Sequence, residues 1–543
     1  MGFTGTKGWT RAGALLGALA IATTLLPVAS AAATGRPTSG PAHVRTVPDP
    51  TPAGTAPKSV PAADPGTWCP TVPGHRVDCG LQTRPLVVDR PGLGTIDVAF
   101  AVVRHSGPGP AKGTVAVNPG GPGESLVDGA PYVTPLLSGL LREHDLLLVD
   151  PRGTGRSERL ECGLTDADLR FADRAAQRAA VARCGRALGP RVAAYTSAAT
   201  ADDIDAIRAR LGVPRLTLYG LSYGTYLMPV YASRHPERVR NMVLSGAYPL
   251  DFDPLSRPGA QAVSLAVRRI CDRAAPTAGG RPACDGRQAV RDLATTAARL
   301  RDRPLRTTVP LAGTDRTRTL LLTEGKLANL AFESASSGVG ADPTAPSLLG
   351  NLPQALNRFA HGDTKPLLDL VRAEYTGADD ADQAPYTAVV CNDYRTAWSP
   401  EAGPAERRRQ YRAALAGTAP GEFGAFSPRG YLEGPTDGGD LCLDWPREHA
   451  PDRQPIRPAL PRVPVLVLSG DLDANTPEAN GRRAAAKFPG AVFVPVRNTG
   501  HVPELSADGC AVELSTRFVT TGTVGDTSCA RRTPPIAVTP VRR

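Results

Sequence analysis

The chain has 543 residues, of which 41% are hydrophobic and 21% are charged, as expected for a soluble globular protein. The length is enough for two to four domain-sized units. The net charge of +10 comes from 62 basic and 52 acidic residues, and the basic residues are scattered without a stripe interleaved with aromatic side chains. This pattern predicts a solvated, mildly basic surface and argues against a nucleic-acid partner.

The first 33 residues have the pattern of a secretory signal peptide. Lys7 and Arg11 form a positive region, an apolar stretch follows at 12–28, and small residues supply a cleavage site. An uncleaved membrane anchor is the alternative, but the apolar run is short and rich in Ala and Gly. No later window has the roughly eighteen consecutive apolar residues of a membrane span. The sequence therefore predicts a secreted, extracellular protein without stable membrane insertion.

The ten cysteines all follow this segment, and their even number suits five disulfides in an oxidising compartment. No CxxC spacing occurs, so neither a zinc site nor a redox centre is predicted. Spacing alone does not fix the connectivity. Pairing neighbours along the chain predicts Cys69–Cys79, Cys162–Cys184, Cys271–Cys284, Cys391–Cys442 and Cys510–Cys529.

Composition and strand pattern divide the rest of the chain into five parts. Residues 34–66 are rich in Pro, Thr, Ala and Gly and have almost no large apolar side chains, so a disordered linker or a pro-segment is predicted. The other parts are a first core segment, a helical cap, a second core segment and a basic tail, predicted at 67–250, 251–455, 456–530 and 531–543.

Short apolar runs alternate with helical patterns in the first core segment. Strands are predicted at 96–103, 114–117, 144–149, 216–219 and 242–244. A helix is predicted at 200–211, with Thr200 and Asp203 as its capping box. This alternation predicts an α/β fold, with a mostly parallel sheet covered by helices on both faces.

The pattern changes after residue 251. Helical segments joined by Gly/Pro-rich connections follow, without a clear run of buried strands, at 261–273, 288–301 and 367–375. Strand patterns return at 463–468 and 492–496. A sheet that is interrupted and then completed indicates one domain carrying an inserted, mainly helical cap.

One stretch points to nucleophilic chemistry. The apolar run from residue 216 breaks at Gly220-Leu221-Ser222-Tyr223-Gly224 and resumes with a helical pattern. This strand, turn and helix would hold a serine at the tip of a sharp turn, where glycines let the chain segments approach closely. A GxSxG pattern alone is equally compatible with a chance surface turn and with a nucleophile.

The late strand patterns supply the partners that a nucleophilic serine needs. Asp471 and Asp473 follow the first of them, and His501 follows the second. Catalytic groups of open α/β sheets collect at the carboxyl ends of the strands. A serine hydroxyl needs a base to take its proton and a carboxylate to orient that base. We therefore predict Ser222 as nucleophile, His501 as base and Asp473 as orienting acid. Asp471 is the alternative acid, and a structural histidine is the alternative for His501.

A glycine-rich loop, Asn118-Pro119-Gly120-Gly121-Pro122-Gly123, follows the strand pattern at 114–117. The loop lacks the Gly-Lys-Ser/Thr ending of a phosphate-binding P-loop. Its expected role is an oxyanion site, where a backbone N–H faces developing negative charge. Gly121 is the predicted donor, with Gly120 as the alternative, and the N–H of Tyr223 is the second donor.

Together, NPGGPG, DPRGTGRS at 150–157, GLSYG, GDLDANTP and TGH resemble motifs of secreted serine aminopeptidases of the prolyl and tripeptidyl type, within the α/β-hydrolase superfamily. The resemblance covers about residues 68–530, including a C-terminal region similar to that of actinobacterial tripeptidyl aminopeptidases. It implies an α/β-hydrolase fold, a serine hydrolase without cofactor or metal, the roles assigned above, and a bracing role for Arg152. Asn118-Pro119 stands where prolyl iminopeptidases usually have His, which is closer to the tripeptidyl relatives.

The leading functional hypothesis is a secreted serine exopeptidase that releases short peptides, by resemblance tripeptides, from free N-termini through an acyl-enzyme. Glu124, beside the glycine loop, and Asp393, in the cap, are candidates to pair with the substrate amine, and a surface charge or a salt bridge is the alternative for each. An extracellular carboxylesterase or lipase is the second hypothesis. A catalytically inactive binding protein is the third, and no oligomeric state is predicted.

Overall fold

The computed structural model describes residues 65–337, 344–435, 438–446, 448 and 450–541. The predicted signal peptide and most of the predicted linker lie outside them. The strands are β1 (Val77–Pro85), β2 (Thr95–Val103), β3 (Thr114–Asn118), β4 (Asp145–Val149), β5 (Leu216–Leu221), β6 (Val239–Ser245), β7 (Leu305–Pro310), β8 (Thr317–Leu322), β9 (Val465–Gly470) and β10 (Val492–Val496). The helices are α1 (Pro65–Trp68), α2 (Ala130–Leu136), α3 (Asp166–Phe171), α4 (Arg174–Leu188), α5 (Ser197–Arg210), α6 (Gly224–Arg234), α7 (Arg257–Arg273), α8 (Gly286–Asp302), α9 (Glu324–Ser337), α10 (Leu348–Ala360), α11 (Lys365–Tyr375), α12 (Ala384–Asp393), α13 (Pro404–Ala416), α14 (Pro428–Leu432), α15 (Glu478–Ala485) and α16 (Cys510–Thr521).

Eight strands form one sheet in the order β1-β2-β4-β3-β5-β6-β9-β10. The pairs β1/β2 and β2/β4 are antiparallel, and the other pairs are parallel. The predicted mostly parallel sheet is confirmed. Only β1 escaped prediction among these strands, because it lies at the edge and its side chains are mostly half-buried, so it has no hydrophobic run.

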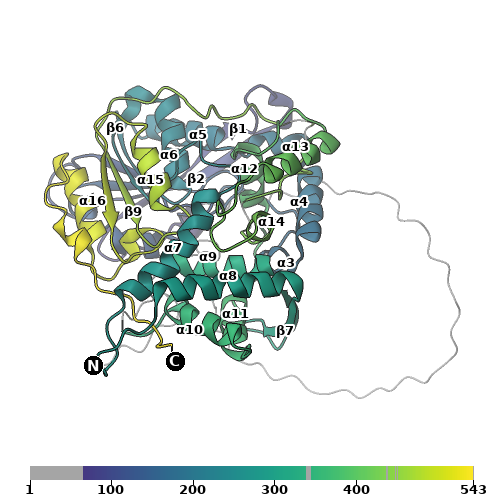
Figure 1. The fold of residues 1–543 in the computed structure, drawn as a ribbon. Coiled ribbons are helices and arrows are strands. Elements are labelled where there is room, and N and C mark those ends of the chain that lie inside the picture. The colour runs from purple at the N-terminus through teal and green to yellow at the C-terminus, as the bar shows by residue number, and fades with distance from the viewer. Residues whose placement is uncertain (1–64, 338–343, 436–437, 447, 449, 542–543) are drawn as a thin grey trace, which may run out of the picture.

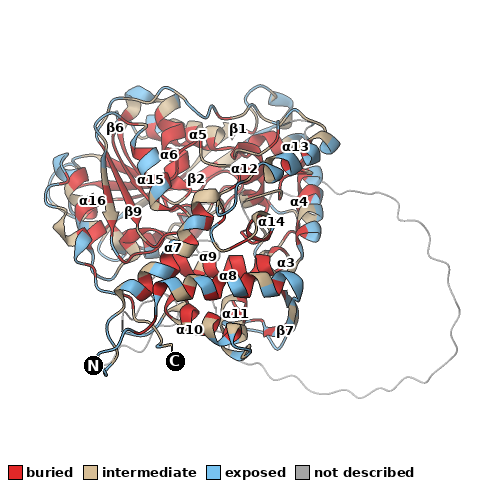
Figure 2. Cartoon of the chain, viewed as in Figure 1, coloured by how far each residue is buried: buried red, intermediate tan, exposed pale blue. Residues whose placement is uncertain are grey.

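The two faces of the sheet enter separate cores. In β5, Leu216 and Leu218 pack into one core with residues of α5 and α6, whereas Tyr219 and Leu221 pack into the other with residues of α2 and α16. Alternate side chains of a strand point to opposite faces, which accounts for this division. Strand β9 is buried along its length, and β6 is buried at every residue except Arg240 (Figure 2). Helices therefore cover both faces, as predicted.

The helix before β5 begins earlier than predicted. Helix α5 starts at Ser197 with Thr196 as its N-cap. The predicted capping box at Thr200 and Asp203 is wrong, since both residues lie inside the helix. Asp203 is buried and accepts hydrogen bonds from Arg152 at 2.7 and 2.8 Å. Arg152 also donates to two backbone carbonyls, so it braces neighbouring loops as expected.

Helices α7 to α14 lie between β6 and β9 and correspond to the predicted cap. In Figure 1, α8, α10 and α11 form a block below the sheet, and α8 is buried on one side and exposed on the other (Figure 2). The cap also contains the antiparallel hairpin β7–β8, which was not predicted. Both strands are short and alternate between exposed and buried residues, without a continuous apolar run.

The described part of the predicted basic tail joins the core to the cap. Near the end of β10, Asn498 Nδ2 donates to the carbonyl of Pro534 at 3.0 Å. Further along, the N–H of Thr539 donates to the carbonyl of Gly350 in α10 at 3.0 Å. Ile536, between these contacts, is buried. Figure 1 shows the yellow tail running from the sheet toward α10.

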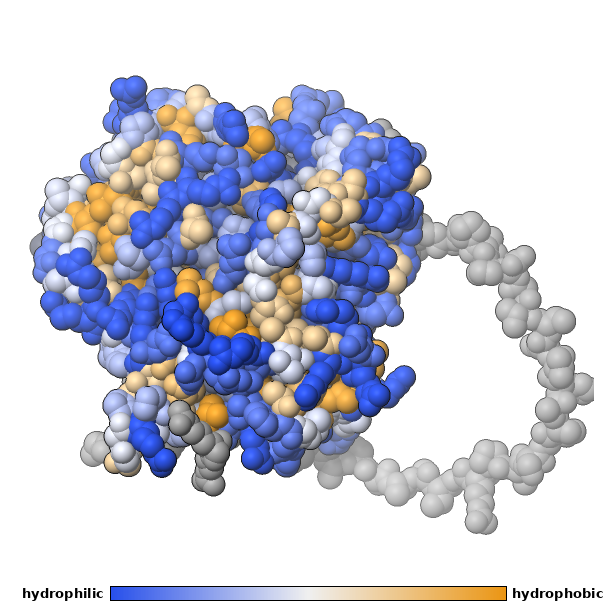
Figure 3. All heavy atoms as spheres, viewed as in Figure 1, coloured by the Kyte–Doolittle hydropathy of each residue, from blue (hydrophilic) through white to orange (hydrophobic). Residues whose placement is uncertain are grey.

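All five predicted cysteine pairs are at disulfide distance: Cys69–Cys79, Cys162–Cys184, Cys271–Cys284, Cys391–Cys442 and Cys510–Cys529. None of the helices in the described part of the chain combines the length and the apolar composition of a membrane span. The face of the molecule in Figure 3 is mostly hydrophilic, with hydrophobic residues in small, separate areas.

Candidate active site

The GxSxG stretch forms the sharp turn between β5 and α6. Ser222 has a φ of +53°, in the left-handed region that non-glycine residues rarely adopt. A Cβ atom on Gly220 would lie 2.3 Å from the carbonyl oxygen of Gly224, and one on Gly224 would lie 2.4 Å from that of Asn118. The two glycines are therefore required by close backbone approach. Ser222 is half-buried and lines a cavity at the carboxyl end of β5.

Asp473 and His501 form a buried pair at the ends of β9 and β10. Nδ1 of His501 lies 2.9 Å from Oδ2 of Asp473. Oδ1 of Asp473 accepts the backbone N–H groups of Asn475 and Thr476 at 2.8 and 3.1 Å. Burial acts to raise the pKa of Asp473, but His501 and the hydrogen bonds outweigh it and hold this pKa below its usual value. The carboxylate therefore stays ionised beside the imidazole.

The other nitrogen of His501 is available for chemistry. Nε2 is buried and has no hydrogen-bond partner among the described residues. The end of β6 connects the ring to the serine, because the carbonyl of Ser245 accepts the N–H of Ser222 at 3.0 Å. A Cβ on the next residue, Gly246, would lie 3.0 Å from Cε1 of His501. The cap also contacts this loop, since the N–H of His501 donates to the carbonyl of Ser336 in α9 at 2.6 Å.

Asp471, the alternative acid, has different partners. Its carboxylate pairs with Arg273 of the cap at 2.6 Å and accepts the N–H of Asn498 at 2.8 Å. These bonds connect the ends of β9 and β10 to α7. The structure thus brings Asp473, and not Asp471, to the imidazole of His501.

The glycine loop lies against the serine. Gly120 and Gly121 have φ values of +117° and +97°, and a Cβ on Gly120 would lie 2.7 Å from the Cβ of Ser222. The N–H of Gly120 donates to Oδ1 of Asn118 at 3.1 Å. Within the described residues, the N–H groups of Gly121 and Tyr223 donate no hydrogen bond, and Gly121 lines the same cavity as Ser222. Gly121 is therefore better placed than Gly120 to donate to an oxyanion.

Glu124 lies beside this loop. A Cβ on Gly121 would lie 3.0 Å from Cγ of Glu124. The Glu124 side chain makes no hydrogen bond or ion pair with another described residue, and the residue is half-buried. Burial, together with the negative charge of Asp379, raises the pKa of Glu124 well above its usual value. A cation next to this carboxylate would relieve both effects.

Asp393, the other candidate for the substrate amine, lies elsewhere. It is buried, and its Oδ2 accepts the N–H and the hydroxyl of Ser197, both at 2.6 Å. Oγ of Ser197 is in turn 2.7 Å from Oη of Tyr223. Burial raises the pKa of Asp393 to about 6, although the bonds from Ser197 oppose this shift. Neither Asp393 nor Glu124 is among the residues that line the cavity at Ser222, but Oδ2 of Asp393 already accepts two hydrogen bonds from Ser197, which favours Glu124 of the two for the substrate amine.

Sequence reasoning missed most of the cavity wall. Aromatic side chains from four separate segments line it: Tyr248, Phe252, Phe332, Tyr394 and Tyr431. The rings of Phe252 and Tyr394 are 5.1 Å apart in an edge-to-face arrangement. No short motif marks these residues, because they are more than 180 positions apart from first to last. Among the described residues, no group of three or more His, Cys, Asp or Glu side chains could hold a metal ion.

Glu504 was also missed. This buried carboxyl, three residues after His501, accepts the hydroxyls of Tyr219 in β5 and Ser245 in β6 at 2.8 and 2.5 Å. Burial raises its pKa, although the hydroxyl bonds act in the other direction. Glu504 therefore ties the His501 loop to the two strands beside Ser222. Its position close after the histidine was the one available signal.

The comparisons with known proteins agree with this geometry. A model of the alpha/beta hydrolase fold matches residues 113–294, and a model described as TAP-like protein matches residues 435–529. Serine protease Hip1 of Mycobacterium tuberculosis is 29% identical over 487 residues, which cover 83% of this chain and 86% of that protein. Tripeptidyl aminopeptidase of Streptomyces coelicolor is 26% identical and covers 84% of each chain. Carboxylesterase B of Mycobacterium tuberculosis is 28% identical and covers 83% of this chain and 85% of that protein. The chain is therefore a serine hydrolase of the α/β-hydrolase fold with a TAP-like C-terminal region.

Proposed function

We propose that this protein is a secreted serine exopeptidase that releases short peptides, specifically tripeptides, from free N-termini through an acyl-enzyme intermediate. The observation that carries the proposal is the Asp473–His501 pair at 2.9 Å, in which Nε2 of His501 has no hydrogen-bond partner among the described residues. The imidazole lies beside the end of β6, where the carbonyl of Ser245 also accepts the N–H of the strained Ser222. A peptide substrate is supported by the relatives named serine protease and tripeptidyl aminopeptidase. Secretion is supported by the N-terminal pattern and by five disulfides, which suit an oxidising compartment.

Each residue has a defined role in the proposed reaction. Nε2 of His501 takes the proton of Ser222 Oγ as this oxygen attacks the scissile carbonyl carbon. Asp473 accepts the Nδ1–H, which selects the tautomer with a free Nε2 and stabilises the imidazolium. The N–H groups of Gly121 and Tyr223 donate to the oxyanion.

The tetrahedral intermediate then collapses. His501 donates its proton to the departing amine, the C–N bond breaks, and the N-terminal peptide remains as an ester on Ser222. His501 next deprotonates a water molecule that attacks this ester. The proton returns from His501 to Oγ of Ser222, and the short peptide is released as a carboxylic acid, which loses its proton to solvent.

Selection of free N-termini requires a negative charge near the acyl end of the substrate. We assign this role to Glu124, whose carboxyl has no partner in the part of the chain that the structure describes and lies next to Gly121. A substrate ammonium group would supply the missing cation and restore the ionised carboxylate. Acetylation of the N-terminus removes this charge and should abolish the pairing.

Product analysis tests the proposal directly. A peptide library with free and with acetylated N-termini is incubated with the enzyme, and the products are identified by mass spectrometry. We expect three residues to be released from free N-termini and acetylated peptides to resist cleavage. Equal cleavage of both sets would rule out exopeptidase selection through the amine, and release of single residues or dipeptides would correct the product length.

An extracellular carboxylesterase is the second candidate, because one relative of similar identity is named carboxylesterase B. Tripeptidyl and prolyl anilides assayed beside p-nitrophenyl esters separate the two, and activity confined to esters would overturn the peptidase proposal. A catalytically inactive binding protein is tested by labelling with a fluorophosphonate. Label on the wild-type protein, and none on Ser222→Ala, is the result expected of an active serine hydrolase.

A further inference from the structure

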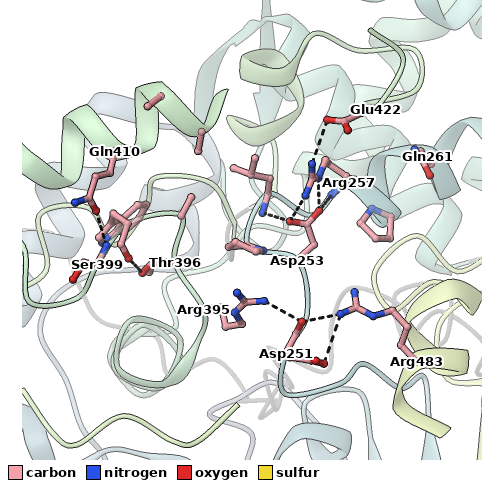
Figure 4. Close-up of a pocket in the computed structure, with 17 residues that line it drawn as sticks. Asp251, Asp253, Arg257, Gln261, Arg395, Thr396, Ser399, Gln410, Glu422 and Arg483 are labelled. Carbon is pink, nitrogen blue, oxygen red and sulfur yellow. Dashed lines mark hydrogen bonds and ion pairs between the residues drawn. The ribbon is translucent and has the colours of Figure 1, made fainter. Parts of the chain in front are cut away.

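A second, larger cavity of about 960 Å³ is lined by the residues drawn in Figure 4. Asp253 and Pro258 line both cavities. Elsewhere in the wall, adjacent residues face opposite ways: Phe252 and Tyr394 line the cavity at Ser222, whereas Asp251 and Arg395 line the larger one. The two cavities therefore adjoin at Asp253 and Pro258, and elsewhere a single layer of chain separates them.

The two cavities differ in size and in the ligand they suit. The cavity at Ser222 has a volume of about 70 Å³, which is room for a small side chain. The larger cavity is in the range of sites that hold ligands of several residues, roughly 300–1,000 Å³. Its wall combines apolar residues with polar ones, including Leu255, Trp398, Ala414, Gln261 and Ser399. This mixture suits a peptide, which presents backbone amides and varied side chains.

The charges of the larger cavity are unevenly paired. Each carboxylate has a cationic partner: Asp251 pairs with Lys487 at 2.6 Å, and Asp253 with Arg257 at 2.6 Å. Glu422 also pairs with Arg257, at 3.3 Å. In contrast, Arg395 pairs with no carboxylate among the described residues.

The guanidinium of Arg395 is held in place without being neutralised. It donates to the backbone carbonyls of Asp251 and Phe252 at 3.1 and 3.0 Å. In Figure 4, Arg395 and Arg483 approach the backbone of Asp251 from either side. The larger cavity therefore presents one oriented positive charge whose complement is a carboxylate.

We propose that this larger cavity binds the leaving peptide, the part of the substrate on the C-terminal side of the scissile bond, and that Arg395 binds a carboxylate of that peptide. The inference rests on the proposed peptidase function, because only a peptide substrate has such a leaving group. Gly121 lines the cavity at Ser222 and not the larger cavity, and its neighbour Glu124 lines neither, so we place the amine end of the substrate beside Gly121 and the leaving end in the larger cavity.

A cavity-filling substitution tests where the leaving peptide binds. Ala414→Trp in α13 would fill the cavity, and Ala416→Trp, in the same helix but outside the lining, is the matched control. Two substrates share one N-terminal tripeptide: its p-nitroanilide and a nonapeptide. We expect Ala414→Trp to raise KM for the nonapeptide by about tenfold and to leave the anilide unchanged, as for loss of a subsite contact. An unchanged nonapeptide KM, or an equal rise for both substrates, would overturn the proposal.

Direct binding separates this inference from the proposed activity. The hexapeptide product of the nonapeptide is titrated into wild-type, Ala414→Trp and Ala416→Trp proteins by calorimetry, which requires no turnover. Binding that is lost only in Ala414→Trp supports the site even if the enzyme cleaves neither substrate. Cleavage of the anilide without hexapeptide binding to the wild-type protein overturns the site and leaves the peptidase proposal standing.

The role of Arg395 is tested with hexapeptides that differ in their carboxylates. One carries a free C-terminus, one is amidated, and one is amidated with an added aspartate, so the two sources of carboxylate are distinguished. We expect the wild-type protein to bind a carboxylate form roughly fivefold more tightly than the neutral amide. Arg395→Gln should lose this preference, whereas Arg483→Gln should keep it, because Arg483 already faces Asp251. Equal binding of all three peptides to the wild-type protein would contradict the assignment.

Discussion

The two carboxylates beside the site at Ser222 lie in opposite environments. On the β9–β10 side, Asp473 is buried and accepts bonds from His501 and from backbone N–H groups, and its pKa is lowered. On the glycine-loop side, Glu124 has no partner among the described residues, and its pKa is raised. In the proposed reaction, the protein itself stabilises the charge of Asp473, whereas the charge of Glu124 would be paired by the ammonium group of the substrate.

The largest effect is expected from a substitution of Asp473. Asp473→Asn keeps the shape of the site but stabilises the wrong tautomer of His501, so kcat/KM should fall on the order of 10⁴-fold. Asp471→Asn is the matched control, because Asp471 pairs with Arg273 and does not contact His501. Its kcat/KM on tripeptidyl anilides should stay within a few-fold of wild type. Equal losses in the two variants would contradict the assignment of Asp473.

The next largest effect is expected from a substitution of Glu124. Glu124→Gln removes the negative charge without changing the size of the side chain, so the preference for free over acetylated N-termini should fall roughly 10- to 100-fold, the value of a charge-assisted hydrogen bond. Initial rates on matched free and acetylated tripeptidyl anilides measure this preference. Glu143→Gln, which removes a surface partner of Lys112, should leave it unchanged. A preserved preference in Glu124→Gln would move amine recognition to another residue.

The same two carboxylates should affect stability in opposite directions. The folded pKa of Glu124 lies above its usual value of 4.5, so ionisation of Glu124 destabilises the folded protein as pH rises from that value through the folded pKa. The folded pKa of Asp473 lies below 3.8, so its stabilising contribution is present above pH 3.8 and is lost as pH falls through the folded pKa. At pH 7, Glu124→Gln should therefore raise Tm and Asp473→Asn should lower it, each by roughly 1–4 °C. Thermal unfolding measures both, and shifts in the same direction would contradict the contrast.

The smallest effect on catalysis is expected far from both carboxylates. Ending the chain after Arg532 removes Ile536 from its buried position and breaks the bonds to Asn498 and Gly350. We expect Tm to fall by several degrees, since burying a large aliphatic side chain contributes about 1.5–3 kcal/mol. The kcat/KM on tripeptidyl anilides should change by less than about fivefold, because no tail residue lines the cavity at Ser222. Removing only Arg542 and Arg543 is the control and should change neither quantity.

How much of the structure can be predicted from the sequence depends on how far apart along the chain the interacting residues lie. Seven of the eight strands of the main sheet have an apolar run, so local patterns were sufficient to predict them. Ser222, Asp473 and His501 each follow the end of such a run, which is why the sequence offers them as candidates. The edge strand β1 and the hairpin β7–β8 were missed, because their side chains are only partly buried and their stability depends on pairing with distant residues. The disulfides were predicted because each partner is the next cysteine along the chain.

The environment of each carboxylate could not be predicted in the same way. Glu124 and Asp393 were equivalent candidates by residue type, and folding separated them. Ser197, nearly two hundred positions before Asp393, donates two hydrogen bonds to Asp393, whereas Glu124 has no partner among the described residues. By itself, the sequence determined where most strands lie along the chain, the sharp turn at Ser222 and the residue types at the strand ends, because these depend on neighbours within a few positions. Only the tertiary structure decided which carboxylate meets His501, which remains unpaired beside Gly121, and where two cavities share a wall. Those outcomes depend on packing between the sheet and a cap inserted more than two hundred residues along the chain.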